Sequence, residues 1–195
     1  MQDVSVRMLS GFAGFGGGGG AGTSHINVEV YGGRYGVYFD RSEPCPLVGS
    51  ARLINQTESA IFFSSQPTMI VVGVSIVQHP AAKGPAIVVP SANSPISLID
   101  VVVSCGTNNG TALQVASSIT AHNVYLSPSC RAGIHGSGWP DRSSSAGWVR
   151  VDELVRGTNF SSHDNTMLMD VAYVDGKRHV SHRVHKVSAN ANTCS

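Results

Sequence analysis

The segment HINVEVYGGRYGVYFD (residues 25–40) has two glycines, Gly32 and Gly33, between two runs in which apolar and polar residues alternate. A two-residue glycine loop between alternating runs predicts a β-hairpin with a primed turn. In this hairpin Val30 is opposite Tyr35. Because side chains on a strand alternate between its faces, one face of the hairpin is apolar and is expected to cover a core. That face carries Ile26, Val28, Val30, Tyr35, Val37 and Phe39.

A second hairpin is predicted in TMLMDVAYVDGKRHVSHRVHKV (residues 166–187), where Asp175 and Gly176 form the turn and Val174 pairs with Lys177. Counting outward from this turn again separates the two faces. One face collects Met167, Met169, Val171, Tyr173, Val180, His182 and Val184.

The residues between the two hairpins consist of short runs rich in Val and Ile, separated by proline, glycine and asparagine turns. The segment TALQVASSITAH (residues 111–122) fits either a helix or a strand. We find no internal repeat of fixed period. Short strands at near-regular spacing predict an all-β fold, which we interpret as an antiparallel β-sandwich of jelly-roll type over residues 25–195.

Residues 1–24 are expected to form a separate N-terminal strand and a glycine-rich arm. DVSVRML (residues 3–9) alternates like a strand, and GFAGFGGGGGAG (residues 11–22) has almost no side chains. Because glycine loses more conformational entropy than other residues when it is fixed, an ordered arm needs a contact that holds it. We expect a neighbouring subunit to supply this contact. The predicted contact residues are Val4, Val6, Met8, Phe12 and Phe15.

The composition of the 195 residues narrows the classes of partner. Only 13% are charged, 42% are hydrophobic and the net charge is +1. A net charge this small creates no positive potential that would attract nucleic acid. No apolar run is long enough for a membrane-spanning helix. We therefore expect neither partner, and we identify no export signal. The four cysteines have no CxxC spacing, which favours buried thiols or one or two disulfides over a zinc or redox site. They are Cys45, Cys105, Cys130 and Cys194.

Three motifs resemble sites but lack the context that their chemistry needs. GFGGGG (residues 14–19) fits G-x-G-x-x-G, yet a strand rather than a helix is expected to follow. On a strand, the three-residue spacing of His179, His182 and His185 places the middle histidine on the opposite face, which disfavours a metal site. HGSG (residues 135–138) is not a nucleophile elbow. We predict no catalytic residue, cofactor or metal.

Two tryptophans flank a polar loop and offer a rim for a glycan or protein partner, formed by Trp139, Arg142 and Trp148. The low charge, the arm and the absence of a catalytic constellation favour a structural subunit of a symmetric assembly. We predict a virus or bacteriophage virion protein (capsid, decoration, spike or tail component) that binds copies of itself and other subunits. One alternative is an extracellular lectin- or adhesin-like domain that binds host-surface glycans, and a second is a cryptic hydrolase.

Overall fold

The structure is a computed structural model that describes residues 1–17, 23–40, 46–66, 68–106, 110–130, 132–135, 147–156, 171–174 and 177–180. These residues contain strands and turns and no helix. Ten strands form sheet A: β1 (Ser5–Met8), β3 (His25–Ile26), β4 (Glu29–Gly32), β6 (Leu47–Ile54), β8 (Met69–Val77), β10 (Ile96–Ser104), β12 (Ile119–Leu126), β14 (Val149–Arg156), β15 (Val171–Val174) and β16 (Lys177–Val180). Six form sheet B: β2 (Ala13–Gly16), β5 (Tyr35–Phe39), β7 (Ser59–Phe63), β9 (Ile87–Val89), β11 (Thr111–Val115) and β13 (Ala132–His135).

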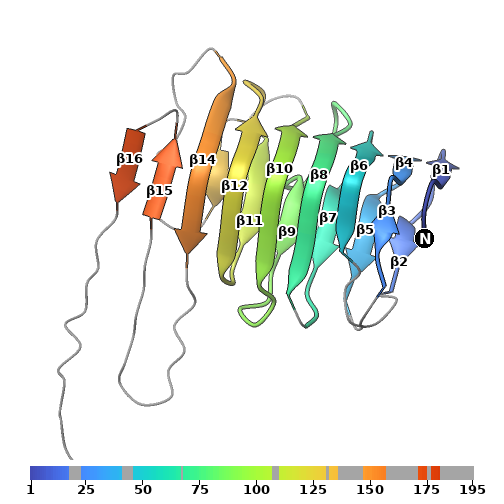
Figure 1. Ribbon diagram of the computed structural model, residues 1–195. Coiled ribbons are helices and arrows are strands. Elements are labelled where there is room, and N and C mark those ends of the chain that lie inside the picture. Colours follow the sequence, from blue (N-terminus) through green and yellow to red (C-terminus); the bar gives the residue numbers. More distant parts are fainter. Residues whose placement is uncertain are drawn as a thin grey trace, which may run out of the picture.

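The chain crosses from sheet A to sheet B and back, and each strand lies beside its counterpart from the previous circuit. Within sheet A, β1, β4, β6, β8, β10 and β12 pair in parallel, and sheet B is parallel throughout. Figure 1 shows sheet A running from β1 (blue) to β16 (red), with the strands of sheet B behind it. This arrangement is a β-solenoid.

The all-β expectation is correct, but the antiparallel jelly-roll sandwich is wrong. Antiparallel pairing is confined to β12, β14, β15 and β16 among the described strands. The first predicted hairpin does not form, because β4 and β5 lie in different sheets. Gly32 and Gly33 have φ angles of 81° and 77° and make the corner between the sheets. Val30 pairs instead with Val6 and Leu53, and Val37 with Phe15 and Ile61.

Two other segments form strands. Val174 pairs with Lys177 in the β15–β16 hairpin, which is the predicted register. Residues 111–122, which fitted a helix or a strand, contribute β11 and the start of β12. The second hairpin is therefore confirmed over residues 171–174 and 177–180, while its predicted continuation lies outside the described residues.

A short motif recurs at the bend of sheet A, where each circuit has a residue with positive φ. In register order these residues are Asp3, Asn27, Ser50, Gly73, Asp100 and Asn123, with φ between 53° and 66°. Each is followed by a small aliphatic residue, any residue, and a second aliphatic residue: DVSV, NVEV, SARL, GVSI, DVVV and NVYL. Asx and glycine residues tolerate this backbone conformation best. The side chains also stack, since Asn27 Nδ2 donates to Asp3 Oδ1 at 2.7 Å and Asn123 Nδ2 to Asp100 Oδ1 at 2.6 Å.

The positive φ at Asn27 explains why Ile26 does not lie on the core face predicted for it. Val28 and Val30 are buried as expected, whereas Ile26, on the other side of the bend, is 38% exposed. The bend thus reverses the face assignment within a single alternating run. The two aliphatic positions of the motif form rows of core side chains along the solenoid.

A row of small residues runs across sheet B. These are Gly14, Gly36, Ala60, Ala86 and Ala112. A Cβ atom on Gly14 would lie 2.4 Å from Val30 Cγ1 of sheet A, so no larger residue fits there without a shift. Each of these small residues is followed in the sequence by an apolar residue that faces inward. These apolar side chains and the aliphatic side chains of the sheet A motif form one continuous core.

Candidate interaction surface

The outer face of sheet A carries two rows of apolar side chains. The first row is Ile26, Val48, Val72 and Ile99, and the second is Tyr31, Ile54 and Val77. Ile99 is 37% and Val77 41% exposed. They alternate along the strands with buried residues such as Leu98 and Ile76, and so point away from the core. We call these two sets the outer apolar rows.

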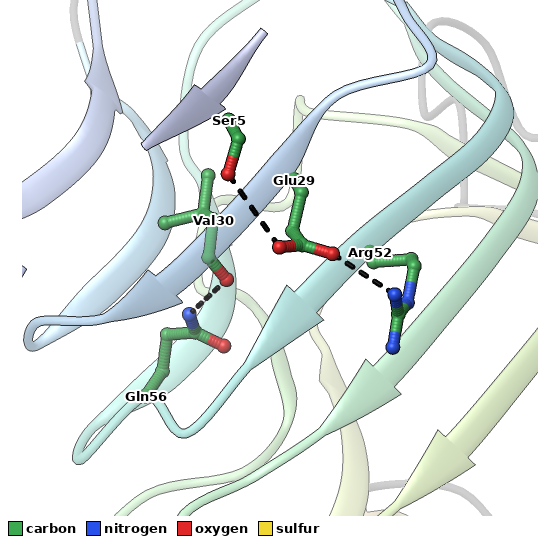
Figure 2. Close-up of polar contacts among 5 residues, drawn as sticks. All are labelled: Ser5, Glu29, Val30, Arg52 and Gln56. Carbon is green, nitrogen blue, oxygen red and sulfur yellow. Dashed lines mark hydrogen bonds and ion pairs between the residues drawn. The ribbon is translucent and has the colours of Figure 1, made fainter. Parts of the chain in front are cut away.

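A polar row separates the outer apolar rows near the N-terminal end of the solenoid. Glu29 accepts hydrogen bonds from the Ser5 hydroxyl at 3.5 Å and from Arg52 Nη1 at 3.0 Å, so that three successive strands are linked (Figure 2). The Arg52 side chain is 60% exposed. Exposed pairs of this kind add little to stability, because water screens them and their side chains lose entropy. The row instead sets the charge pattern of this face.

Two buried glutamines lie at the corners between the sheets. Gln56 Nε2 donates to the carbonyl oxygens of Ile54, Val30 and Gly32 at 2.9, 3.1 and 3.2 Å. Figure 2 shows the bond to Val30. Gln78 donates to the carbonyls of Glu58 and Gly84 and accepts from the Gly106 amide. Corners expose backbone groups that no strand pairs, and these side chains satisfy them. Both glutamines therefore have a structural role.

A disulfide occupies the same corner further along the solenoid. Cys105 and Cys130, 25 residues apart, follow β10 and β12 and are joined across neighbouring circuits. Both residues are buried. The Ser129 hydroxyl adds a hydrogen bond of 2.8 Å to the Cys105 carbonyl. Cys45 and Cys194 lie outside the described residues.

The outer face of sheet B carries four aromatic side chains near the N-terminal end: Phe12, Tyr35, Tyr38 and Phe62. Tyr38 and Phe62 stack with centroids 4.6 Å apart, and Phe12 meets Tyr38 edge-on at 4.7 Å. Arg34 lies over Phe12 and Tyr35 at 5.6 and 5.7 Å from the ring centroids. Burial raises the pKa of Tyr35, and the carboxylate of Glu58 raises it further. We call the four rings the aromatic cluster.

One histidine lies inside the core. His25 is only 9% exposed and stacks between Phe15 and Phe39, with centroid distances of 4.7 and 6.2 Å. Its Nδ1 has no hydrogen-bond partner among the described residues. Burial lowers the pKa of His25, and the charged amino group of Met1 lowers it further. The site favours the neutral imidazole.

The residues predicted to contact a neighbouring subunit lie in the first circuit. Val4, Val6 and Met8 pack against the core, and Phe15 belongs to it with 8% exposure. Phe12 is 52% exposed and joins the aromatic cluster. Because β1 pairs with β4 and β2 with β5, contacts within the chain are enough to place these strands. Their contact with another subunit stays a prediction.

The other predicted residues are not brought together. Trp148 is 54% exposed beside β14, whereas Trp139 and Arg142 lie outside the described residues. Of the three spaced histidines, only His179 falls in a described strand, β16. Gly14 and Gly16 of the G-x-G-x-x-G match lie in β2. Sequence reasoning missed the outer apolar rows and Arg34, because both depend on which circuits become neighbours.

The described ranges contain neither a candidate metal site nor a membrane-spanning helix. No group of three or more His, Cys, Asp or Glu residues there is arranged to hold a metal ion. No helix in the described part of the chain is long and apolar enough to cross a membrane. No protein-family model matches the chain, and no curated protein or solved structure shows significant similarity to it.

Proposed function

We propose that the protein is a structural, non-enzymatic subunit of a symmetric assembly and that copies associate through the outer apolar rows. The observation that carries this proposal is the repetition of exposed aliphatic side chains along sheet A, including Ile26, Val77 and Ile99 at 37–41% exposure. Exposed apolar side chains that gather on one face and are bordered by polar residues such as Glu29 and Arg52 favour an interaction site. Other subunits of the same particle are further partners in this proposal.

Within this class we propose a virion component. A solenoid repeats the same surface at each circuit, which suits a spike or fibre whose subunits pack along their length. The buried Cys105–Cys130 disulfide supports a location on the outside of a particle, because disulfides persist in oxidising surroundings. A chain with 13% charged residues also associates more readily than a highly charged one.

The test compares the oligomeric state of the wild type with that of the double variant Ile26→Lys, Ile99→Lys, by light scattering and electron microscopy across a concentration series. We expect the wild type to form discrete symmetric oligomers and the variant to be monomeric. Both residues are exposed, so circular dichroism should show that the fold is retained. Gln114→Lys, an exposed position on sheet B, is the matched control. A wild type that stays monomeric, or a double variant that assembles normally, contradicts the proposal.

A further inference from the structure

A cleft of about 430 Å³ lies at the corner between the sheets, at the N-terminal end of the solenoid. Three successive circuits contribute to its lining: Leu9, Ser10 and Phe12 from the β1–β2 turn, Arg34 from the β4–β5 corner, and Thr57 from the turn before β7. Its volume falls in the range of small-molecule sites and fits a ligand of one or two sugar rings. It is separate from the outer apolar rows.

Backbone hydrogen bonds hold the three circuits of the cleft together. The amides of Arg34 and Tyr35 donate to the carbonyls of Gly11 and Phe12 at 2.8 and 2.9 Å, and the Thr57 amide donates to Gly33 at 3.0 Å. Contacts within the chain thus hold the backbone of the cleft in place. A preformed site avoids the entropic cost of ordering loops during binding.

One wall of the cleft is apolar and faces water. Leu9 is fully exposed and Phe12 is 52% exposed, although both are large apolar residues. Tyr35 and Tyr38 meet the Phe12 ring at tilted angles, with centroids 5.3 and 4.7 Å away, and so fix its orientation. An exposed and rigid ring beside a cleft offers an apolar contact to a ligand at low entropic cost.

The polar groups near the cleft balance in charge. Arg34 Nε lies 4.0 Å from Glu58 Oε1, and the Arg34 and Glu58 side chains are 55% and 28% exposed. The hydroxyls of Ser10 and Thr57 add further hydrogen-bonding groups on the lining. A strongly anionic ligand would be repelled by Glu58 and a cationic one by Arg34. The arrangement suits a neutral ligand that has hydroxyl groups on one side and an apolar face on the other.

We infer that this cleft binds a neutral saccharide. A pyranose ring presents an apolar C–H face, which lies against Phe12, and hydroxyls, which bond to Arg34 and Thr57 on the lining. The inference does not depend on the proposed assembly, since the cleft is built from one chain. It also differs from the rim predicted around Trp139, Arg142 and Trp148, because it places the sugar at the opposite end of the solenoid from Trp148.

The experiment is ligand-observed saturation-transfer NMR on the full chain. The probes are glucose, galactose, mannose and N-acetylglucosamine with their β1,4-linked disaccharides, and glucuronic acid and N-acetylneuraminic acid as anionic comparisons. We expect at least one neutral probe to receive saturation, strongest at its C–H face. We expect Phe12→Ala to abolish the signal and Arg34→Gln to weaken binding at least tenfold. Trp148→Ala is the matched control and should bind like the wild type.

Each other outcome overturns the inference. If no neutral probe receives saturation, or if binding persists in both Phe12→Ala and Arg34→Gln, the cleft is not a saccharide site. Preference for an anionic probe removes the assignment to neutral sugars. Loss of binding in Trp148→Ala alone moves the site to the tryptophan rim. Thermal unfolding of each variant distinguishes lost binding from lost folding. Repeating the titration with the Ile26→Lys, Ile99→Lys protein separates sugar binding from assembly.

Discussion

At the scale of single residues, two glycines with positive φ have different surroundings, Gly32 at the corner between the sheets and Gly49 within β6. Gly32 has a φ of 81°, and a Cβ atom there would lie 2.0 Å from the Met8 carbonyl oxygen. Gly49 has a φ of 65° but open space around a Cβ atom. Alanine substitutions at the two glycines can therefore distinguish the energetic cost of a positive φ from the cost of a steric clash.

We predict that Gly32→Ala destabilises the protein much more than Gly49→Ala. The left-handed conformation alone costs an alanine about 1–2 kcal/mol, and only Gly32→Ala adds a clash with backbone that must move. Urea unfolding followed by circular dichroism measures both free energies of unfolding. Equal losses in the two variants would show that the corner at Gly32 is not packed as the structure has it.

His25 predicts a dependence of stability on pH. Its pKa in the folded state lies below the ordinary value of 6.5, so the unfolded chain binds a proton more readily. The stabilisation is therefore fully present above pH 6.5 and is lost as the pH falls through the folded pKa. His25→Leu, which matches its neighbour Leu47 in the row, should flatten the free energy of unfolding over this acidic range. An unchanged pH profile in the variant would contradict the prediction.

At the scale of elements, the sequence predicted strands and turns better than their partners. The alternation in 25–40 located β4 and β5, and the two glycines located the turn between them. Between bends such as that at Asn27, alternation indicates which face a residue occupies, but it does not say which strand lies beside it or in which direction. The first pairing was therefore wrong, while the Asp175-Gly176 hairpin, whose partners are adjacent in the chain, was right.

The repeated motif escaped detection for a physical reason. Its bend residue varies among Asp, Asn, Ser and Gly, and the spacings between copies are 24, 23, 23, 27 and 23 residues. Loops of unequal length absorb the differences, so that stacking is regular in space but not in sequence. The cleft could not be predicted either, because Phe12, Arg34 and Thr57 become neighbours only when three circuits stack.

The disulfide is an element-scale constraint on the later circuits. Cys105 and Cys130 close a loop of 25 residues, for which the chain-entropy model gives a stabilisation of about 3.5 kcal/mol. We predict that the double variant Cys105→Ser, Cys130→Ser loses about this much free energy of unfolding in urea. Adding reductant should lower the stability of the wild type and leave the double variant unchanged. If reductant lowered the stability of both proteins equally, the Cys105–Cys130 disulfide would not be the bond that stabilises the chain.

At the scale of the whole molecule, a solenoid is stabilised by contacts between neighbouring circuits, so its end circuits protect the next ones. β1 and β2 form the N-terminal end, where Val6 covers Val30 and Phe15 covers Val37. Val30 and Val37 are fully buried, whereas Val6 is only partly covered. The first circuit therefore acts as a cap for the core, whether or not it also contacts another subunit.

Deleting residues 1–22 distinguishes a cap from an arm that only binds neighbours. If residues 1–22 act as a cap, their deletion exposes Val30 and Val37 to water. Each large apolar side chain that becomes exposed costs about 1.5–3 kcal/mol. We expect the deletion to lower the urea midpoint strongly even in the monomeric Ile26→Lys, Ile99→Lys background. Val6→Ala in the full chain should cause a smaller loss, because Val6 is already partly exposed. An arm that serves only neighbours would leave monomer stability unchanged and abolish assembly, so the two measurements assign the segment to one role, or to both.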